Sequence, residues 1–121
     1  MRIFIADAGT DIRLGIQMLI HQQADMTVIG IAVRTNGLVK QVLATQPDLL
    51  LINWDLPGQN LTGKLNELHA RLPRIRVVVL AVRPEARSPA LAAGADAFID
   101  MNAAPDGLLD TLREVGYARS T

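Results

Sequence analysis

The chain has 121 residues, enough for one compact domain, and half of them are hydrophobic. Only 3% are aromatic, so the core must be built from aliphatic side chains. Twelve basic and twelve acidic side chains cancel, which removes the positive charge that direct binding to nucleic acid normally needs. Cysteine is absent and there are only two histidines, which excludes disulfides, thiol catalysis and a zinc site built from these residues.

The amino-terminal sequence contains neither a signal-peptide pattern nor a membrane-spanning run. Its first apolar stretch, residues 3–6, is too short for either and is followed at once by Asp7. We therefore expect a cytoplasmic protein without membrane contact, folded as a single domain over residues 1–121.

Short apolar runs alternate with segments of helical spacing along the whole chain. This alternation is typical of a parallel sheet covered by helices on both faces. The runs are rich in Val, Ile and Leu, which predicts strands buried on both sides. The predicted strands are residues 3–6, 27–32, 49–52, 77–82 and 97–99.

The segment after the first strand predicts an amphipathic helix. Thr10 is its expected N-cap, and Asp11 adds negative charge to the first turn, where it is favourable. An inward-facing stripe follows at helical spacing, formed by Ile12, Ile16, Leu19 and Ile20.

Three further helices are predicted over about residues 35–44, 61–72 and 105–115, the last with Pro105 in its first turn. The fourth helix in chain order is expected to be short or irregular. Pro84 and Pro89 lie where it should run, before Gly94, so we predict a loop and then a short helix from Pro89.

This order of elements describes a doubly wound α/β domain with right-handed crossovers. In such a sheet, any site lies at the carboxyl ends of the strands, beside the topological switch point. Asp7, Asn53 and Ala81 are therefore expected to lie together at that edge.

Several segments resemble the receiver domain of bacterial response regulators, the CheY-like superfamily. Residues 3–7 (IFIAD) are similar to its first strand and acidic turn, and residues 47–58 (PDLLLINWDLPG) to its third strand and phosphoacceptor loop. Residues 94–99 (GADAFI) are similar to the segment before its last helix. The resemblance implies a flavodoxin-like five-stranded sheet in the order 2-1-3-4-5.

The resemblance also implies a phosphorylation site, but most of its residues are replaced. The family uses an acidic pair for Mg²⁺, an Asp nucleophile, a Thr or Ser hydroxyl and a Lys. Asp7 keeps one acidic position and Ala8 stands at the second. Asn53 stands at the nucleophile position, Ala81 at the hydroxyl position and Met101 at the Lys position. The chain is thus similar to a degenerate, atypical member.

These replacements predict the loss of phosphate transfer. The Asn53 amide is neutral and cannot form the mixed anhydride that a carboxylate forms. One acid and an amide should hold Mg²⁺ weakly at best, and Met101 offers neither charge nor a donor to the transition state. We expect no catalytic residue and no cofactor, with Mg²⁺ binding weak or absent and Asp7 and Asp55 as the weak candidate ligands.

The leading hypothesis is therefore a receiver-like signalling domain of a two-component phosphorelay system, a pseudo-receiver that is not an enzyme and acts through protein–protein interaction. One alternative is phosphorylation at a non-standard residue such as Asp55, and another is a ligand-sensing domain that reuses the pocket. Trp54 and Phe98 are candidates for a partner-binding rim, although both could instead fill space by packing.

The expected partners are a histidine kinase or another regulator, a second copy of the chain, or a fused output domain if the chain is part of a longer regulator. Direct nucleic-acid binding is not expected. In the family, the fourth helix, fifth strand and fifth helix commonly form the signalling face. The prolines at 84 and 89 predict that this face is remodelled.

Overall fold

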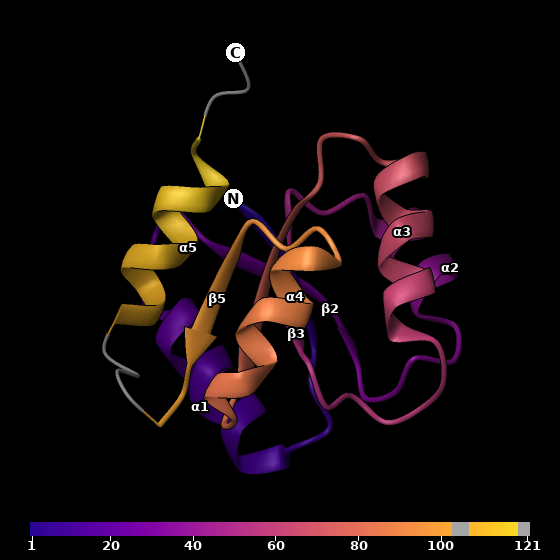
Figure 1. Cartoon of the computed structure of the whole chain (residues 1–121). Coiled ribbons are helices and arrows are strands. Elements are labelled where there is room, and N and C mark those ends of the chain that lie inside the picture. Colours follow the sequence, from indigo (N-terminus) through magenta and orange to yellow (C-terminus); the bar gives the residue numbers. More distant parts are fainter. Residues whose placement is uncertain (103–106, 119–121) are drawn as a thin grey trace.

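The computed structural model describes residues 1–102 and 107–118. Five parallel strands form one sheet in the order β2-β1-β3-β4-β5, with helices on both faces (Figure 1). The strands are β1 (Arg2–Ala6), β2 (Thr27–Ala32), β3 (Leu49–Asn53), β4 (Arg76–Ala81) and β5 (Ala97–Asp100). The predicted fold class and strand order are confirmed, and every predicted strand end lies within one residue of the observed end.

The helices are α1 (Thr10–His21), α2 (Leu38–Thr45), α3 (Leu61–Arg71), α4 (Arg87–Ala92) and α5 (Leu108–Gly116), and a 3₁₀ turn, η1 (Pro84–Ala86), precedes α4. Figure 1 shows α1 and α5 on one side of the sheet and α2 and α3 on the other. Among the described residues, no helix is both long enough and apolar enough to cross a membrane.

Two hydrophobic clusters, one on each face of the sheet, form the core. Successive strand residues alternate between them: Ile3 and Ile5 face α1 and α5, whereas Phe4 faces α2, α3 and α4. The side chains of β1, β3 and β4 are almost entirely buried, and each buried Leu or Ile contributes about 1.5–3 kcal/mol. The outermost strands, β2 and β5, are only partly buried, so the prediction of strands buried on both sides does not hold for them. This rigid sheet fixes where each strand ends, and therefore where the site residues lie.

The start of α1 differs from the prediction in two respects. Gly9 is the N-cap, without a side-chain capping bond, and Thr10 is the first helical residue. Ile16 and Ile20 are buried as predicted, but Leu19 is 40% exposed. Leu19 lies at the edge of the inward stripe, whose buried centre is formed by Ile16 and Ile20.

The second helix begins three residues later than predicted, at Leu38. Gly37 adopts a left-handed φ of 76°, and the Thr35 amide donates to the Pro57 carbonyl at 2.8 Å. Thr35 is fully buried in this contact between two loops, so it cannot also begin the helix.

The fourth helix is short and is preceded by a 3₁₀ turn, which confirms the predicted irregularity. It begins at Arg87, two residues before the predicted start at Pro89. Pro89 is tolerated there because an amide in the first helical turn has no intrahelical acceptor to lose. The predicted start of the last helix at Pro105 lies outside the described residues, and its end at Gly116 is one residue beyond the predicted end.

Candidate functional site

The candidate site lies where β1, β3 and β4 end. Asp7 directly follows β1, Asn53 is the last residue of β3 and Ala81 is the last residue of β4. The register pairs Ala6 with Ile52 and Asn53 with Leu80, so these strand ends are level. The structure therefore brings the three predicted positions to one edge of the sheet.

Asp7 is only 2% exposed, and its carboxylate is held by donors from the protein. The Gly9 amide donates to Oδ1 at 2.8 Å, and the Asn53 side-chain amide donates to Oδ2 at 3.4 Å. A buried carboxylate needs such donors because it has lost water. The arrangement is that of an acidic loop residue satisfied from within the fold.

The side-chain amide of Asn53 uses both of its ends. Nδ2 donates to Asp7, and Oδ1 accepts from the Asp55 amide at 2.8 Å. Turning the amide over would place its oxygen against the Asp7 carboxylate and its NH₂ against another N–H, so only one orientation satisfies both neighbours. Asn53 therefore stabilises the Asp7 carboxylate with a hydrogen bond from a neutral amide and not with a positive charge.

Asp55 is paired with Arg83 across the mouth of the site. Arg83 Nη2 lies 2.5 Å from Asp55 Oδ1, and Arg83 Nε lies 3.3 Å from Asp55 Oδ2. The hydrogen bond to Asp55 raises the pKa of Arg83 above its ordinary value. This two-point contact joins the loop after β3 to the loop after β4.

The other replaced positions are occupied by apolar side chains. Ala81 is fully buried, and its carbonyl accepts from the Met101 amide at 2.9 Å. The Met101 side chain packs against the core cluster under α1 and α5. Ala8 is exposed and lines a shallow hollow of about 650 Å³ together with Arg13 and Arg34.

The two aromatic candidates for a partner rim, Trp54 and Phe98, are half-buried. Both pack against the core cluster formed with α2, α3 and α4. The Trp54 backbone amide also donates to the Leu80 carbonyl at 2.9 Å. Each residue therefore has the space-filling role considered as its alternative, and its contact with a partner stays a prediction.

No family model matches the chain. The nitrate/nitrite response regulator protein NarL of Escherichia coli (strain K12) is 30% identical over 114 residues, which cover 93% of this chain and 53% of NarL. The transcriptional activator protein ExaE of Pseudomonas putida is 31% identical over 121 residues, which cover 95% of this chain and 55% of ExaE. The chain thus spans about half the length of these curated relatives.

Among solved structures, the isolated REC domain of RcsB from Salmonella enterica serovar Typhimurium matches with a TM-score of 0.86 at 18% identity. The match covers 100% of this chain and 91% of the RcsB domain, so the two share the whole fold. The chain has the fold of a response regulator receiver domain.

The donor set of this site does not fit the Mg²⁺ that receiver chemistry implies. Both oxygens of Asp7 already accept hydrogen bonds, Ala8 offers no ligand, and the Asp55 carboxylate is engaged by Arg83. Within the ranges 1–102 and 107–118, no group of three or more His, Cys, Asp or Glu side chains could hold a metal ion. Mg²⁺ prefers carboxylate oxygens that are free to coordinate it.

The sequence analysis did not predict two residues of the site, Arg83 and Asn102. Asn102 Nδ2 donates to the Val82 carbonyl at 2.5 Å and so joins the loop after β5 to the loop after β4. The position of Arg83 in the sequence could have indicated its pairing with Asp55. Arg83 lies two residues after the end of β4, and Asp55 lies two residues after the end of β3. Opposite charges at equal offsets from adjacent parallel strands are well placed to pair.

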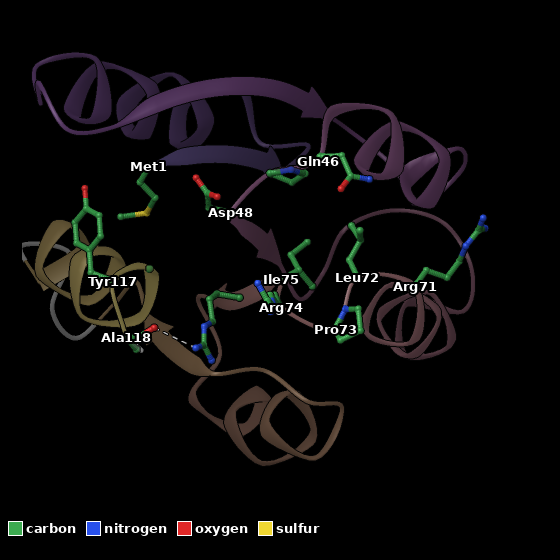
Figure 2. A pocket seen from close by; sticks show the side chains of 13 residues that line it. Met1, Gln46, Asp48, Arg71, Leu72, Pro73, Arg74, Ile75, Tyr117 and Ala118 are labelled. Carbon is green, nitrogen blue, oxygen red and sulfur yellow. Dashed lines mark hydrogen bonds between the residues drawn. The ribbon is translucent and has the colours of Figure 1, made fainter. Parts of the chain in front are cut away.

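A second cavity lies at the amino ends of the strands, at the opposite end of the sheet from Asp7 and Asn53 (Figure 2). It has a volume of about 730 Å³ and is lined by segments that precede β3 and β4 and by the end of α5. Figure 2 shows the hydrogen bond from Arg76 to the Ala118 carbonyl beside it. Because it lies at the amino ends of the strands, this cavity is separate from the Asp7 and Asn53 site.

Proposed function

We propose that this receiver domain signals without accepting phosphate, as a pseudo-receiver of a two-component system that acts through protein–protein contacts. The observation that carries the proposal is the Asn53 amide, which donates to Asp7 and accepts from the Asp55 backbone. A neutral amide is not a nucleophile for phosphorus, and here both of its ends are already bonded.

Direct contacts between the loops support the proposal. Arg83 joins Asp55 to the loop after β4, and Asn102 joins that loop to the loop after β5. The three loops at the carboxyl edge are thereby tied together by side chains of the protein itself. We infer that the loops after β3 and β4 hold one conformation, which a partner recognises directly.

The proposal predicts the outcome of a phosphorylation assay. The purified chain is incubated with acetyl phosphate and Mg²⁺ and its intact mass is recorded, beside a receiver domain that has an acceptor aspartate. The control should gain one phosphoryl group and this chain should gain none. A stable phosphoryl adduct on the wild-type chain would overturn the proposal.

The Asp55→Asn variant separates the proposal from phosphorylation at Asp55. Arg83 contacts both carboxylate oxygens of Asp55 and therefore competes with a phosphoryl donor for them. If the wild-type chain does gain mass and the variant does not, Asp55 is the acceptor and the alternative replaces our proposal.

The partners are proposed at the level of their class. A histidine kinase or another regulator is the expected partner, and in a longer protein a fused output domain would be regulated by this receiver. The names of the relatives include a response regulator and a transcriptional activator, and the chain matches about half of each. Any contact with DNA is expected from such an output domain and not from this neutral chain.

A further inference from the structure

The shallow hollow that Ala8 lines lies at the topological switch point of the sheet. The chain passes from β1 to β2 on one side of β1 and then to β3 on the other side. The lining comes from the segments 8–13, 33–36 and 57–58, which follow β1, β2 and β3. Open parallel sheets bind small ligands in this crevice, outside the carboxyl ends of their strands. The volume of about 650 Å³ is also typical of small-molecule sites.

Two arginines from different segments meet in this hollow. Arg13 lies in the first turn of α1 and Arg34 in the loop after β2, and both belong to the lining. The Arg13 side chain is held in place, because its Nη1 donates to the Asp7 carbonyl at 3.2 Å. A guanidinium group has five N–H donors in a fixed fork, so this bond leaves donors of Arg13 for a ligand.

The positive charge of the hollow is not neutralised by acidic residues of its own lining. None of the lining residues that the structure describes is Asp or Glu. Asp7 lies behind the hollow with its buried carboxylate already hydrogen-bonded within the fold, and Asp11 of the same helical turn does not line it. The adjoining hollow shares two lining residues with this one and adds Lys64. Although the chain as a whole is neutral, this surface therefore attracts an anion.

A buried hydroxyl group in the wall of the hollow is a second, independent observation. Thr35 lies between the lining residues Arg34 and Asn36, and its Oγ1 has no hydrogen-bond partner among the described residues. Oγ1 faces Gly58, also a lining residue, since it is the nearest atom to the place of a Cβ there. Buried hydroxyl groups nearly always have a partner, so this one indicates a group from outside the chain, either ligand or ordered water.

We propose that this hollow is a binding site for a small phosphate-bearing anion. A phosphomonoester carries about −1.5 to −2 charges at neutral pH, which matches two guanidinium groups, and its oxygens accept the paired N–H bonds that Arg donates. Val33, which is 41% exposed, and Pro57 provide an apolar wall for the rest of an ester. The binding is non-covalent, and Asn53, Ala81 and Met101 do not line the hollow. The inference therefore goes beyond the proposed function and is independent of it.

Isothermal titration calorimetry of the whole chain tests the proposal with orthophosphate, phenyl phosphate and benzoate as probes. Both phosphates should bind, and their relative affinity shows whether the bare ion or an ester is preferred. Benzoate, the carboxylate matched to phenyl phosphate, should bind at least about tenfold more weakly than phenyl phosphate, because it carries less charge and has fewer acceptor oxygens.

Arginine variants test whether binding occurs in the hollow. Arg13→Gln and Arg34→Gln should each weaken the binding of phenyl phosphate by about tenfold or more, because each removes charge-assisted hydrogen bonds. Arg74→Gln is the charge-matched control. Arg74 is exposed and lines the cavity at the amino ends of the strands, so its replacement should leave the affinity unchanged.

Nuclear magnetic resonance locates the site without any variant. Phenyl phosphate added to the isotope-labelled chain should shift the backbone amide signals of Arg34, Asn36 and Gly58. The signals of Arg74 and Ile75, which line the other cavity, should stay in place. Circular dichroism checks that the arginine variants are folded, and if one is not, the resonance shifts decide.

Three outcomes would overturn the proposal. They are the absence of binding at millimolar phenyl phosphate, binding that persists in the Arg13→Gln Arg34→Gln double variant, and benzoate binding as tight as that of phenyl phosphate. The last would assign the hollow to a carboxylate, such as an acidic side chain of a partner protein. A non-covalent ligand dissociates when intact mass is recorded under denaturing conditions. The phosphorylation assay is therefore unaffected, so failure of this inference and failure of the proposed function are distinguishable.

Discussion

The side-chain amide of Asn53 donates to the buried carboxylate of Asp7 across the end of the sheet, with Nδ2 and Oδ2 3.4 Å apart. The two groups are complementary, because the amide N–H of Asn53 stabilises the Asp7 carboxylate without a metal ion or an ammonium group. An acidic residue at position 53 would instead place two carboxylates against each other in a site with little water.

Asn53→Asp is expected to destabilise the fold by about 1–3 kcal/mol at neutral pH, because Asp7 Oδ2 loses its donor and faces a second negative charge. Urea denaturation measures the loss. Asn53→Ala, which removes the donor without adding charge, is the control and should be destabilised less. Equal losses in the two variants would contradict the electrostatic account.

Mg²⁺ is expected to leave the melting temperature of the wild-type chain unchanged at millimolar concentration. The Asp7 oxygens already accept hydrogen bonds, and the Asn53 amide adds no negative charge to attract the ion. Asn53→Asp should respond instead, since two facing carboxylates are stabilised by a cation that binds only the folded state. Thermal melts with Mg²⁺, and with matched ionic strength as the control, compare the two proteins. A clear rise for the wild-type chain would contradict our description of the site.

Arg83→Gln is expected to loosen the contact between the loops after β3 and β4 with little effect on global stability. The Asp55 and Arg83 side chains are both 46% exposed, so solvent screens the pair and its contribution to unfolding free energy is small. Hydrogen exchange should nevertheless become faster in both loops, and the fluorescence of Trp54, which precedes Asp55, should change. Lys64→Gln, on α3, is a charge-matched control that should alter neither readout. Unchanged exchange in both loops would show that the ion pair does not hold them.

Asp25 is expected to make the free energy of unfolding depend on pH under acidic conditions. Hydrogen bonds from Arg113 and Tyr117 lower the pKa of Asp25 below its ordinary value. A lowered pKa in the folded state adds stability that is complete above the unfolded value of about 3.9, and this stability is lost as the pH falls through the folded value. Melting temperatures between neutral and acidic pH should therefore fall less steeply in Asp25→Asn than in the wild-type chain. Parallel curves would rule out this contribution.

The strands could be predicted closely because each contains a short apolar run, nearly continuous in Val, Ile and Leu in β3 and β4, that is bounded by polar residues or turns. The level carboxyl ends then follow from parallel pairing, which is why Asp7, Asn53 and Ala81 could be placed together. The start of α2 could not be predicted in the same way. It depends on the bond from Thr35 to the Pro57 carbonyl, which joins two loops far apart in the sequence.

The chemistry within the site was less accessible from the sequence than its position. That Asn53 cannot act as the nucleophile follows from its residue type alone. Its two hydrogen bonds, and the pairing of Asp55 with Arg83 28 residues later, depend on side-chain rotamers that the surrounding loops select. The contact between Arg83 and Asp55 could therefore be identified only from the folded structure.

Gly58→Ala is expected to destabilise the fold strongly, by about 1–3 kcal/mol for the backbone strain alone. Gly58 has a φ of 123°, and a Cβ there would overlap Oγ1 of the buried Thr35. The added methyl group would push apart the loops that follow β2 and β3 and so disturb the bond from Thr35 to the Pro57 carbonyl. Urea denaturation and hydrogen exchange at Thr35 measure the two effects.

Gly15→Ala is the matched control for this substitution. Gly15 lies inside α1, and a Cβ there meets no other atom within 4 Å. Replacing a glycine in a helix interior by alanine should stabilise the protein by about 0.5–1 kcal/mol. The two changes add the same methyl group and should shift the denaturation midpoint in opposite directions. If both shifted it alike, contact between the Gly58 and Thr35 loops would not be what restricts position 58.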